Sequence, residues 1–167
     1  HGEHPLRSAA PREEMRSRLG LSPQIFNRAL PKLASEGVLI EEGPGIRLPQ
    51  HAVALSTVQR KEVEEYVTHL QANPFSPPTD RAIAPELLNV LVEEGKVVKA
   101  SDSMVFHAEA YREMADRIVQ RLRKQGKITV AEVRDMFNTS RKYVMPLMEY
   151  LDQQHITRRV GDERVLL

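Results

Sequence analysis

The chain has 167 residues, of which 41% are hydrophobic and 28% charged, and its formal net charge is +1. This composition is typical of a folded soluble protein made of one medium domain or a few small ones. The lack of Cys excludes disulfides and thiolate metal sites, and no apolar run reaches membrane-spanning length. We therefore expect a cytoplasmic protein, and the opening at His1 without an initiator Met indicates a piece of a longer chain.

The near-zero net charge hides an asymmetry along the chain. Residues 1–54 hold 7 Lys and Arg against 6 Asp and Glu, residues 55–109 hold 5 against 9, and residues 110–167 hold 12 against 8. Basic charge is therefore concentrated in the last third, where a polyanion would be met.

The first third of the chain predicts a helix-turn-helix followed by a β-hairpin. Pro11 starts a helix, Gly20 makes a turn, and Ser22 caps a second helix that has proline at its first position. That helix ends at Gly37, and a strand from Val38 then opens a short hairpin.

The middle third repeats this plan in a degraded form. Residues 58–71 predict an amphipathic helix. The stretch "NPFSPPTDRAIAPELL" then places four prolines where the second helix should be, so only a helical stub is expected there. A helix end at Gly95 and a second hairpin follow.

The last third holds the complete unit. Helices are expected over residues 110–125 and 130–137 and from Arg141 onward, followed by a third hairpin. His155 stands where the two earlier units have a helix-capping glycine.

The three helix-to-hairpin segments superpose without gaps from Leu33, Leu91 and Leu151. The repeated order of helix, short strand, helix, turn, helix, strand, turn and strand is that of a winged helix. The sequence therefore predicts a mainly α, α+β protein of tandem winged-helix domains in an elongated array. The predicted domains are a winged helix with a truncated first helix, a degenerate winged helix acting as a spacer, and a complete winged helix, over residues 1–54, 55–109 and 110–167.

The helix that begins at Arg141 carries two cations in its first turn, where acidic side chains are usual. The first repeat has none at the corresponding position, so the fold does not require them. Free N–H groups at Ser140 favour a phosphate, and Arg141 with Lys142 would reinforce this preference. Solvated surface cations are the alternative interpretation. Tyr143 fits base stacking or core packing, and its apolar counterpart Ile25 favours the core.

The hairpin of the last third is also unusually basic. Arg158 and Arg159 lie on its first strand and Arg164 on its second, on either side of a turn at Gly161 and Asp162. Adjacent strand residues point to opposite faces, so the side chains of Arg158 and Arg159 cannot both point one way. A helix start and a wing are the parts of a winged helix that usually touch nucleic acid, so together they predict a polyanion site.

Catalytic and metal-binding interpretations are poor. The six His are scattered, without the spacing of a metal site. Adjacent Glu pairs point away from each other and indicate solvated faces. There is no Gly-rich phosphate loop. We therefore expect no catalytic residue, no metal and no cofactor in this chain, which is not predicted to be an enzyme.

The residues from Thr129 to Leu166 resemble the last winged-helix domain of the SelB family, the bacterial selenocysteine-specific elongation factors. His4 to Ser22 is similar to the start of that family's second winged-helix domain. The most specific matches are Thr139-Ser140-Arg141-Lys142-Tyr143, Pro146-Leu147, Glu149-Tyr150-Leu151-Asp152, Thr157-Arg158, Gly161-Asp162 and Arg164.

The resemblance implies the second to fourth winged helices of such a factor. The last of them binds the apical loop of the selenocysteine insertion (SECIS) hairpin in mRNA and directs selenocysteine incorporation at UGA. It also implies that GTP, Mg²⁺, selenocysteinyl-tRNA and the ribosome are met by the full-length protein, a GTPase through an N-terminal part, and that the protein is a monomer. The implied RNA-binding residues, with Arg159 added on charge alone, are Ser140, Arg141, Lys142, Tyr143, Arg158, Arg159, Gly161, Asp162 and Arg164.

Two other functions fit a tandem winged-helix protein. A DNA-binding regulator would need a basic recognition-helix face rather than a basic helix start. A protein-interaction array fits the first two repeats better than the third.

Overall fold

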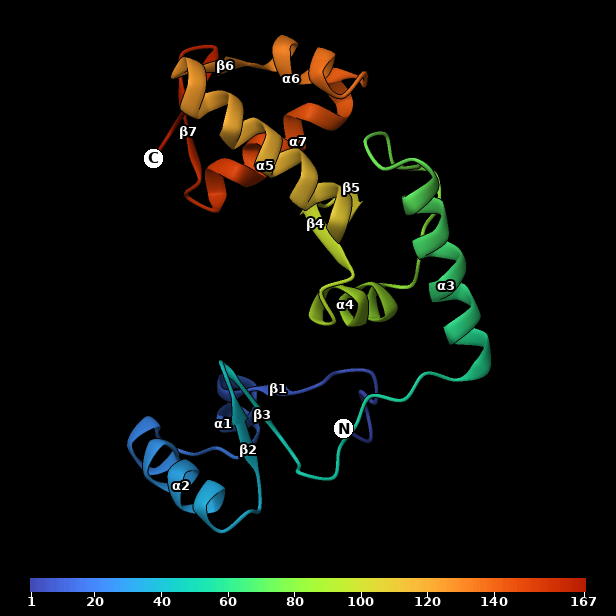
Figure 1. Ribbon diagram of the computed structural model, residues 1–167. Helices are drawn as coiled ribbons and strands as arrows, with labels where there is room; N and C mark the ends of the chain where they lie inside the picture. The colour runs from blue at the N-terminus through green and yellow to red at the C-terminus, as the bar shows by residue number, and fades with distance from the viewer. The chain divides into compact units, whose positions relative to one another are not determined.

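The computed structural model describes all residues of the chain, 1–167, and contains seven helices and eight strands. Figure 1 shows the ribbon with most of these elements labelled. The chain divides into two compact units, residues 1–59 and 60–167. Short antiparallel sheets alternate with helices in both units, which confirms the predicted α+β class of winged-helix repeats. No helix combines the length and the apolar content needed to cross a bilayer.

The first unit holds one three-stranded sheet, in the order β1-β3-β2, and two helices. Its elements are β1 (Ala10–Pro11), α1 (Arg12–Arg18), α2 (Pro23–Ser35), β2 (Ile40–Glu42) and β3 (Gly45–Arg47). The core is small and is made of Phe26 and Leu30 from α2 and Ile46 from β3. The predicted helix start at Ser22 is confirmed, because its hydroxyl accepts the Ile25 N–H at 3.4 Å.

The second unit includes most of α3 (Thr57–Ala72), which begins just before it. Its other elements are α4 (Pro85–Glu93), β4 (Val97–Ser101), β5 (Met104–His107), α5 (Ala108–Gln125), β6 (Ile128–Thr129), α6 (Val130–Met136), α7 (Arg141–Gln153), β7 (Thr157–Val160) and β8 (Glu163–Leu166). A hydrophobic core runs from Met104 and Phe106 of β5 through α5 and α6 to Leu147 and Leu151 of α7. The hairpin of the second repeat therefore contributes to the hydrophobic core of the third.

The sheets and the shortened middle helix follow the predicted pattern. β4 pairs with β5 alone, whereas the last sheet has the order β6-β8-β7, the same arrangement as β1-β3-β2. α4 has 9 residues where α2 and α7 have 13 each, because its prolines delay the helix to Pro85. The division into three modules remains a prediction.

All three repeats end their helix in the same way. The N–H of Val38 bonds to the carbonyl of Leu33 at 3.0 Å, and the same bond recurs from Lys96 and from Ile156. This is the Schellman arrangement, which needs a left-handed residue just before the donor. His155 adopts it with φ +56°, although it carries a side chain. The cap also uses Val38, so β2 begins at Ile40 and the prediction of a strand from Val38 is wrong.

Candidate nucleic-acid interface

The start of α7 leaves the backbone amides of Arg141 and Lys142 without a partner, whereas the Tyr143 N–H bonds to the Ser140 carbonyl at 3.1 Å. Ser140 is the N-cap residue with extended backbone, but its side chain makes no capping hydrogen bond. No acidic residue lies in the first turn, and Arg141 and Lys142 are exposed there. Unsatisfied N–H groups and two cations therefore gather at the positive end of this helix, a suitable arrangement for an anion.

The exposed cations of the predicted site differ in how they are held. The side chains of Arg141 and Arg158 form no hydrogen bond or ion pair. The Lys142 ammonium donates to the Thr79 hydroxyl at 2.7 Å and lies 5.5 Å from the centre of the Tyr143 ring. Arg159 Nε donates to the Gly161 carbonyl at 2.8 Å. Two cations are thus free, and two are positioned by neighbours within reach of solvent.

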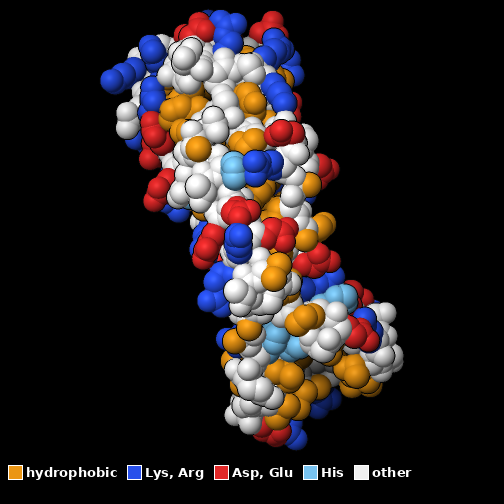
Figure 2. Space-filling model, turned by 90° about the vertical axis from the view of Figure 1, so that its right-hand side faces the viewer, with side chains coloured by type: hydrophobic (Ala, Val, Ile, Leu, Met, Phe, Trp, Pro, Cys, Tyr) orange, Lys and Arg blue, Asp and Glu red, His pale blue; other side chains and the backbone are white.

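A shallow hollow of about 300 Å³ lies between the start of α6, the start of α7 and the last hairpin. It brings together four of the predicted residues: Arg141, Arg159, Asp162 and Arg164. Lys142, Tyr143 and Arg158 do not line it. In Figure 2, Lys and Arg side chains gather at the end of this unit that carries α6 and the last sheet.

Arg164 lines the hollow but is only 3% exposed. Its Nε donates to Asp152 Oδ2 at 2.8 Å, and the Thr157 hydroxyl donates to Asp152 Oδ1 at 2.6 Å. The guanidinium is therefore used to join β8 to α7. The pairing of Arg164 with Asp152 was not predicted from the sequence. The only signal for this pair in the sequence is that the two residues carry opposite charges.

The turn of the hairpin presents a different set of groups. Gly161 has φ +62°, a conformation that glycine adopts without the steric cost of a Cβ. The Asp162 side chain is fully exposed, and its carboxylate lies 3.8 Å from Arg159. The Lys127 ammonium pairs with Glu163 at 2.8 Å, and this contact raises the pKa of Lys127.

Tyr143 is half-buried and packs against the core of the second unit, with the Lys142 ammonium over its ring. Its counterpart Ile25 is 57% exposed. Ile25 therefore lies outside a core, because α2 begins on the outside of a much smaller one. The half-buried position of Tyr143 allows one part of the ring to pack against the core and another part to contact a base.

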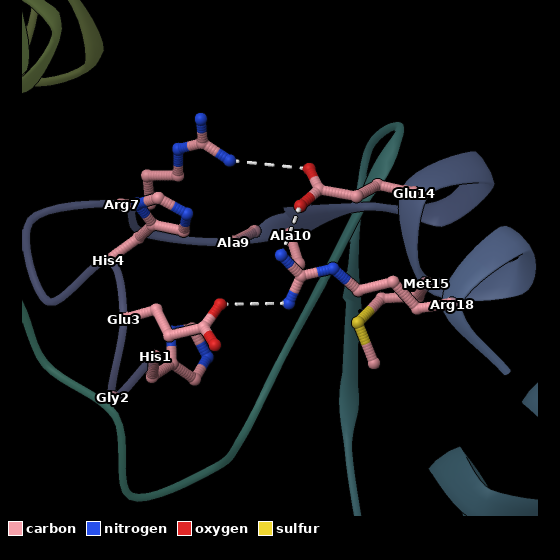
Figure 3. A pocket seen from close by; sticks show the side chains of 10 residues that line it. All are labelled: His1, Gly2, Glu3, His4, Arg7, Ala9, Ala10, Glu14, Met15 and Arg18. Carbon is pink, nitrogen blue, oxygen red and sulfur yellow. Dashed lines mark hydrogen bonds and ion pairs between the residues drawn. The ribbon is translucent and has the colours of Figure 1, made fainter.

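A second hollow, in the first unit, is lined by residues 1–18 and is shown in Figure 3. Its charges satisfy one another: Arg7 pairs with Glu14 at 3.3 Å, and Arg18 pairs with Glu3 at 3.1 Å and with Glu14 at 3.7 Å. All the Arg and Glu side chains that line it are therefore paired. No three His, Asp or Glu side chains are grouped so as to hold a metal ion.

Two family models described as "Elongation factor SelB, winged helix" match the chain. The model of the second winged helix matches residues 1–48, and the model of the third matches residues 120–166. The matches cover 48 and 47 residues, together more than half of the chain. The resemblance in sequence had implied the fourth winged helix for the last module, so the family model numbers that module differently.

Two curated relatives carry the description selenocysteine-specific elongation factor. The protein of Desulfomicrobium baculatum is 29% identical over 179 residues, which cover 98% of this chain and 28% of that protein. The protein of Haemophilus influenzae is 23% identical over 154 residues, which cover 85% of this chain and 25% of that protein. The chain thus spans about a quarter of the length of these relatives.

Two solved structures share the fold. The bacterial selenocysteine-specific elongation factor EF-Sec superposes with a TM-score of 0.55 at 16% identity, covering 95% of this chain and 26% of that one. The mRNA-binding domain of elongation factor SelB from E. coli, solved in complex with SECIS RNA, superposes with a TM-score of 0.52 at 18% identity, covering 67% of this chain and 98% of that one. At these identities the likeness concerns the fold.

Proposed function

The chain belongs to the SelB family of elongation factors through its winged-helix domains, and from this premise we propose that its last winged helix binds the apical loop of the SECIS hairpin in selenoprotein mRNA. One observation carries the proposal. The open start of α7 and the last hairpin bring two exposed cations, Arg141 and Arg159, to one hollow, and the exposed Lys142 and Arg158 lie on the same two elements.

An RNA loop suits this surface better than a duplex. The deep major groove of A-form RNA is too narrow for side chains to read, so sequence-specific recognition targets loops and splayed bases. The exposed cations number only four, enough for a few phosphates. The hollow of about 300 Å³ would then receive an extruded base.

Each predicted residue has a role in this proposal. Arg141, Lys142 and Arg158 contact phosphates, and the amides after Ser140 bind a phosphate oxygen. Tyr143 offers the edge of its ring to an unpaired base.

In the hairpin, Arg159 is held toward the turn and contacts the RNA backbone, while Gly161 supplies the tight turn. Asp162 shapes that turn or accepts a hydrogen bond from a base edge. Arg164 acts through Asp152, by fixing the wing against α7, rather than by direct contact.

The rest of the activity belongs to the longer protein of which the relatives are examples. We propose that residues 1–54, 55–109 and 110–167 form three non-catalytic winged-helix modules of a cytoplasmic, monomeric factor. In this proposal GTP and Mg²⁺ bind elsewhere in the full-length factor, which also carries selenocysteinyl-tRNA to the ribosome.

The test is a binding titration of the chain against a SECIS hairpin, a loop-scrambled hairpin and a DNA duplex, at two salt concentrations. We expect a preference for the native loop that Arg141→Ala removes. Four phosphate contacts on a single-stranded loop would give a slope of log K against log salt of about −3. Arg123→Ala is the matched control, because Arg123 is an exposed, unpaired cation of α5 outside the site. Equal binding to all three nucleic acids would overturn the proposal.

A further inference from the structure

A loop of the middle repeat contacts the start of α7. The segment from Asn73 to Thr79, between α3 and α4, lies beside the turn that joins α6 to α7 (Figure 1). The Thr139 hydroxyl donates to the Phe75 carbonyl at 2.8 Å and shares a second hydrogen bond with the Ser76 hydroxyl at 2.7 Å. Residues more than 60 positions apart in sequence thus meet at the site.

The loop is anchored in the hydrophobic core. The ring of Phe75 packs on that of Phe137, with centroids 5.0 Å apart, and the Arg117 guanidinium covers the same Phe137 ring at 4.5 Å. Pro77 is buried, and prolines restrict the backbone of the segment. The loop is therefore a fixed support for whatever its far end touches.

That far end is Thr79, whose hydroxyl accepts a hydrogen bond from the Lys142 ammonium at 2.7 Å. A lysine side chain has a flexible four-carbon stem and loses much rotamer freedom when it binds a ligand. Because Thr79 already restricts the side chain, a phosphate would meet an ammonium that needs little further ordering. An ammonium has three N–H donors, so the bond to Thr79 leaves two for the phosphate.

We propose that Thr79 is a positioning residue for RNA binding, which acts by holding Lys142 over Tyr143 at the start of α7. The proposal rests on the proposed function of that helix start, and it gives the middle repeat a part in recognition beyond that of a spacer. Asp80 is the neighbouring acidic group; it forms no ion pair with Lys142, so the hydroxyl is the group that holds the ammonium.

The first test compares Thr79→Val, which keeps the shape but removes the hydroxyl, with Thr79→Ser, which keeps the hydroxyl. Thr79 is exposed, so neither change opens a cavity. We expect Thr79→Val to weaken binding of the SECIS hairpin by about threefold to tenfold, the size of one hydrogen bond, and Thr79→Ser to bind like wild type.

A double-mutant cycle separates positioning from general damage. In a Lys142→Ala background, Thr79→Val should have no further effect on hairpin affinity, because its target is gone. An equal loss in both backgrounds, or no loss in the wild-type background, would overturn the proposal.

A measurement without RNA keeps this inference distinct from the proposed function. Side-chain NMR relaxation of the Lys142 ε-methylene should show a restricted group in wild type and a mobile one in Thr79→Val. If the wild-type chain does not prefer the native hairpin, the proposed function fails, whereas the relaxation result still decides whether Thr79 holds Lys142. Equal mobility of Lys142 in both proteins would refute the positioning role.

Discussion

The helices α2 and α7 occupy the same place in two repeats, but their first-turn N–H groups differ. A side chain caps one of these groups in α2, and none is capped by a side chain in α7. Both helices have 13 residues, a serine N-cap and an internal proline. In α2 the Ser22 hydroxyl caps an amide, and Pro23 removes another donor. In α7 the Ser140 side chain caps nothing, and Arg141 follows. One scaffold thus carries a closed helix start in the first unit and an open, basic one in the second.

The hairpins differ in the same two repeats. Ile46 lies on the central strand of the first sheet and pairs with Ala10 of β1, and Arg164 lies in the equivalent register and pairs with Ile128 of β6. Both side chains are buried, at 7% and 3% exposure. A buried ion pair with Asp152 therefore replaces an apolar contact without changing the sheet.

The largest expected effect comes from breaking that ion pair. Asp152→Ala leaves Arg164 buried without its partner and should lower the free energy of unfolding by about 3–5 kcal/mol. Urea denaturation of the two proteins measures the difference.

The matched control rebuilds the first repeat's apolar set in the last one. Asp152→Ala, Thr157→Leu and Arg164→Ile together reproduce Ala34, Leu39 and Ile46. This triple variant should be as stable as wild type or more stable by about 1–4 kcal/mol. A triple variant as unstable as Asp152→Ala would show that the site is not equivalent to that of the first repeat.

The next effect separates binding from stability at the open helix start. Arg141→Glu should weaken binding of the SECIS hairpin about tenfold to hundredfold, because it replaces a phosphate contact by a repulsion. The same change places an acid at the positive end of α7 and should stabilise the fold by about 0.3–1 kcal/mol. Gln24→Glu is the control on α2, where hairpin affinity should not change. A parallel loss of stability and affinity in Arg141→Glu would contradict the proposed role.

A smaller effect concerns the start of α6, which is capped, whereas α1 has Pro11 as its N-cap residue and no side-chain cap. The Thr129 hydroxyl accepts the Glu132 N–H, and the Glu132 carboxylate accepts the Thr129 N–H, so the pKa of Glu132 is lowered by these hydrogen bonds. Thr129→Ala should cost about 1 kcal/mol at neutral pH.

The cost of Thr129→Ala should also depend on pH. A carboxyl group with a lowered folded-state pKa contributes stability above its unfolded pKa, near 4.5, and that contribution is lost as the pH falls through the lowered value. Chemical denaturation of both proteins at pH 7 and below pH 4 should therefore show a smaller difference in acid. An undiminished cost in acid would mean that the charge of Glu132 plays no part.

The smallest effect concerns the helix caps. Gly37 and Gly95 have φ of +70° and +66°, and His155 adopts the same conformation at +56°. His155→Gly should stabilise the protein by about 0.5–1 kcal/mol, because it removes the Cβ clash at the cost of a more flexible unfolded chain. Thermal unfolding measures this gain, and SECIS affinity should stay unchanged.

The periodicity of the sequence was sufficient to predict local structure. The helix expected over residues 58–71 is α3, and the one expected from Arg141 is α7, because i, i+3, i+4 spacing of apolar residues is a local property. The basic helix start was equally visible, since it depends only on neighbours in sequence.

Contacts between distant segments were not predictable in this way. Arg164 was expected to face a ligand. Strand alternation alone could not show that its side chain is buried and donates a hydrogen bond to Asp152 of α7. The bond from Lys142 to Thr79 joins residues 63 positions apart, and the prolines around Thr79 indicated only a loop. Composition describes a segment, but its partner is set by tertiary packing.

The buried bond between Arg164 and Asp152 has a consequence for which RNAs can be accepted. It ties β8 to α7, so the spacing between the cations of the hairpin and those of the helix is set by the core and not by the ligand. An RNA loop must then bring its phosphates to that spacing by bending itself. In the proposed function, the affinity of loops that offer the same contacts would depend on their flexibility. A loop stiffened by one added base pair would bind less well than its flexible parent.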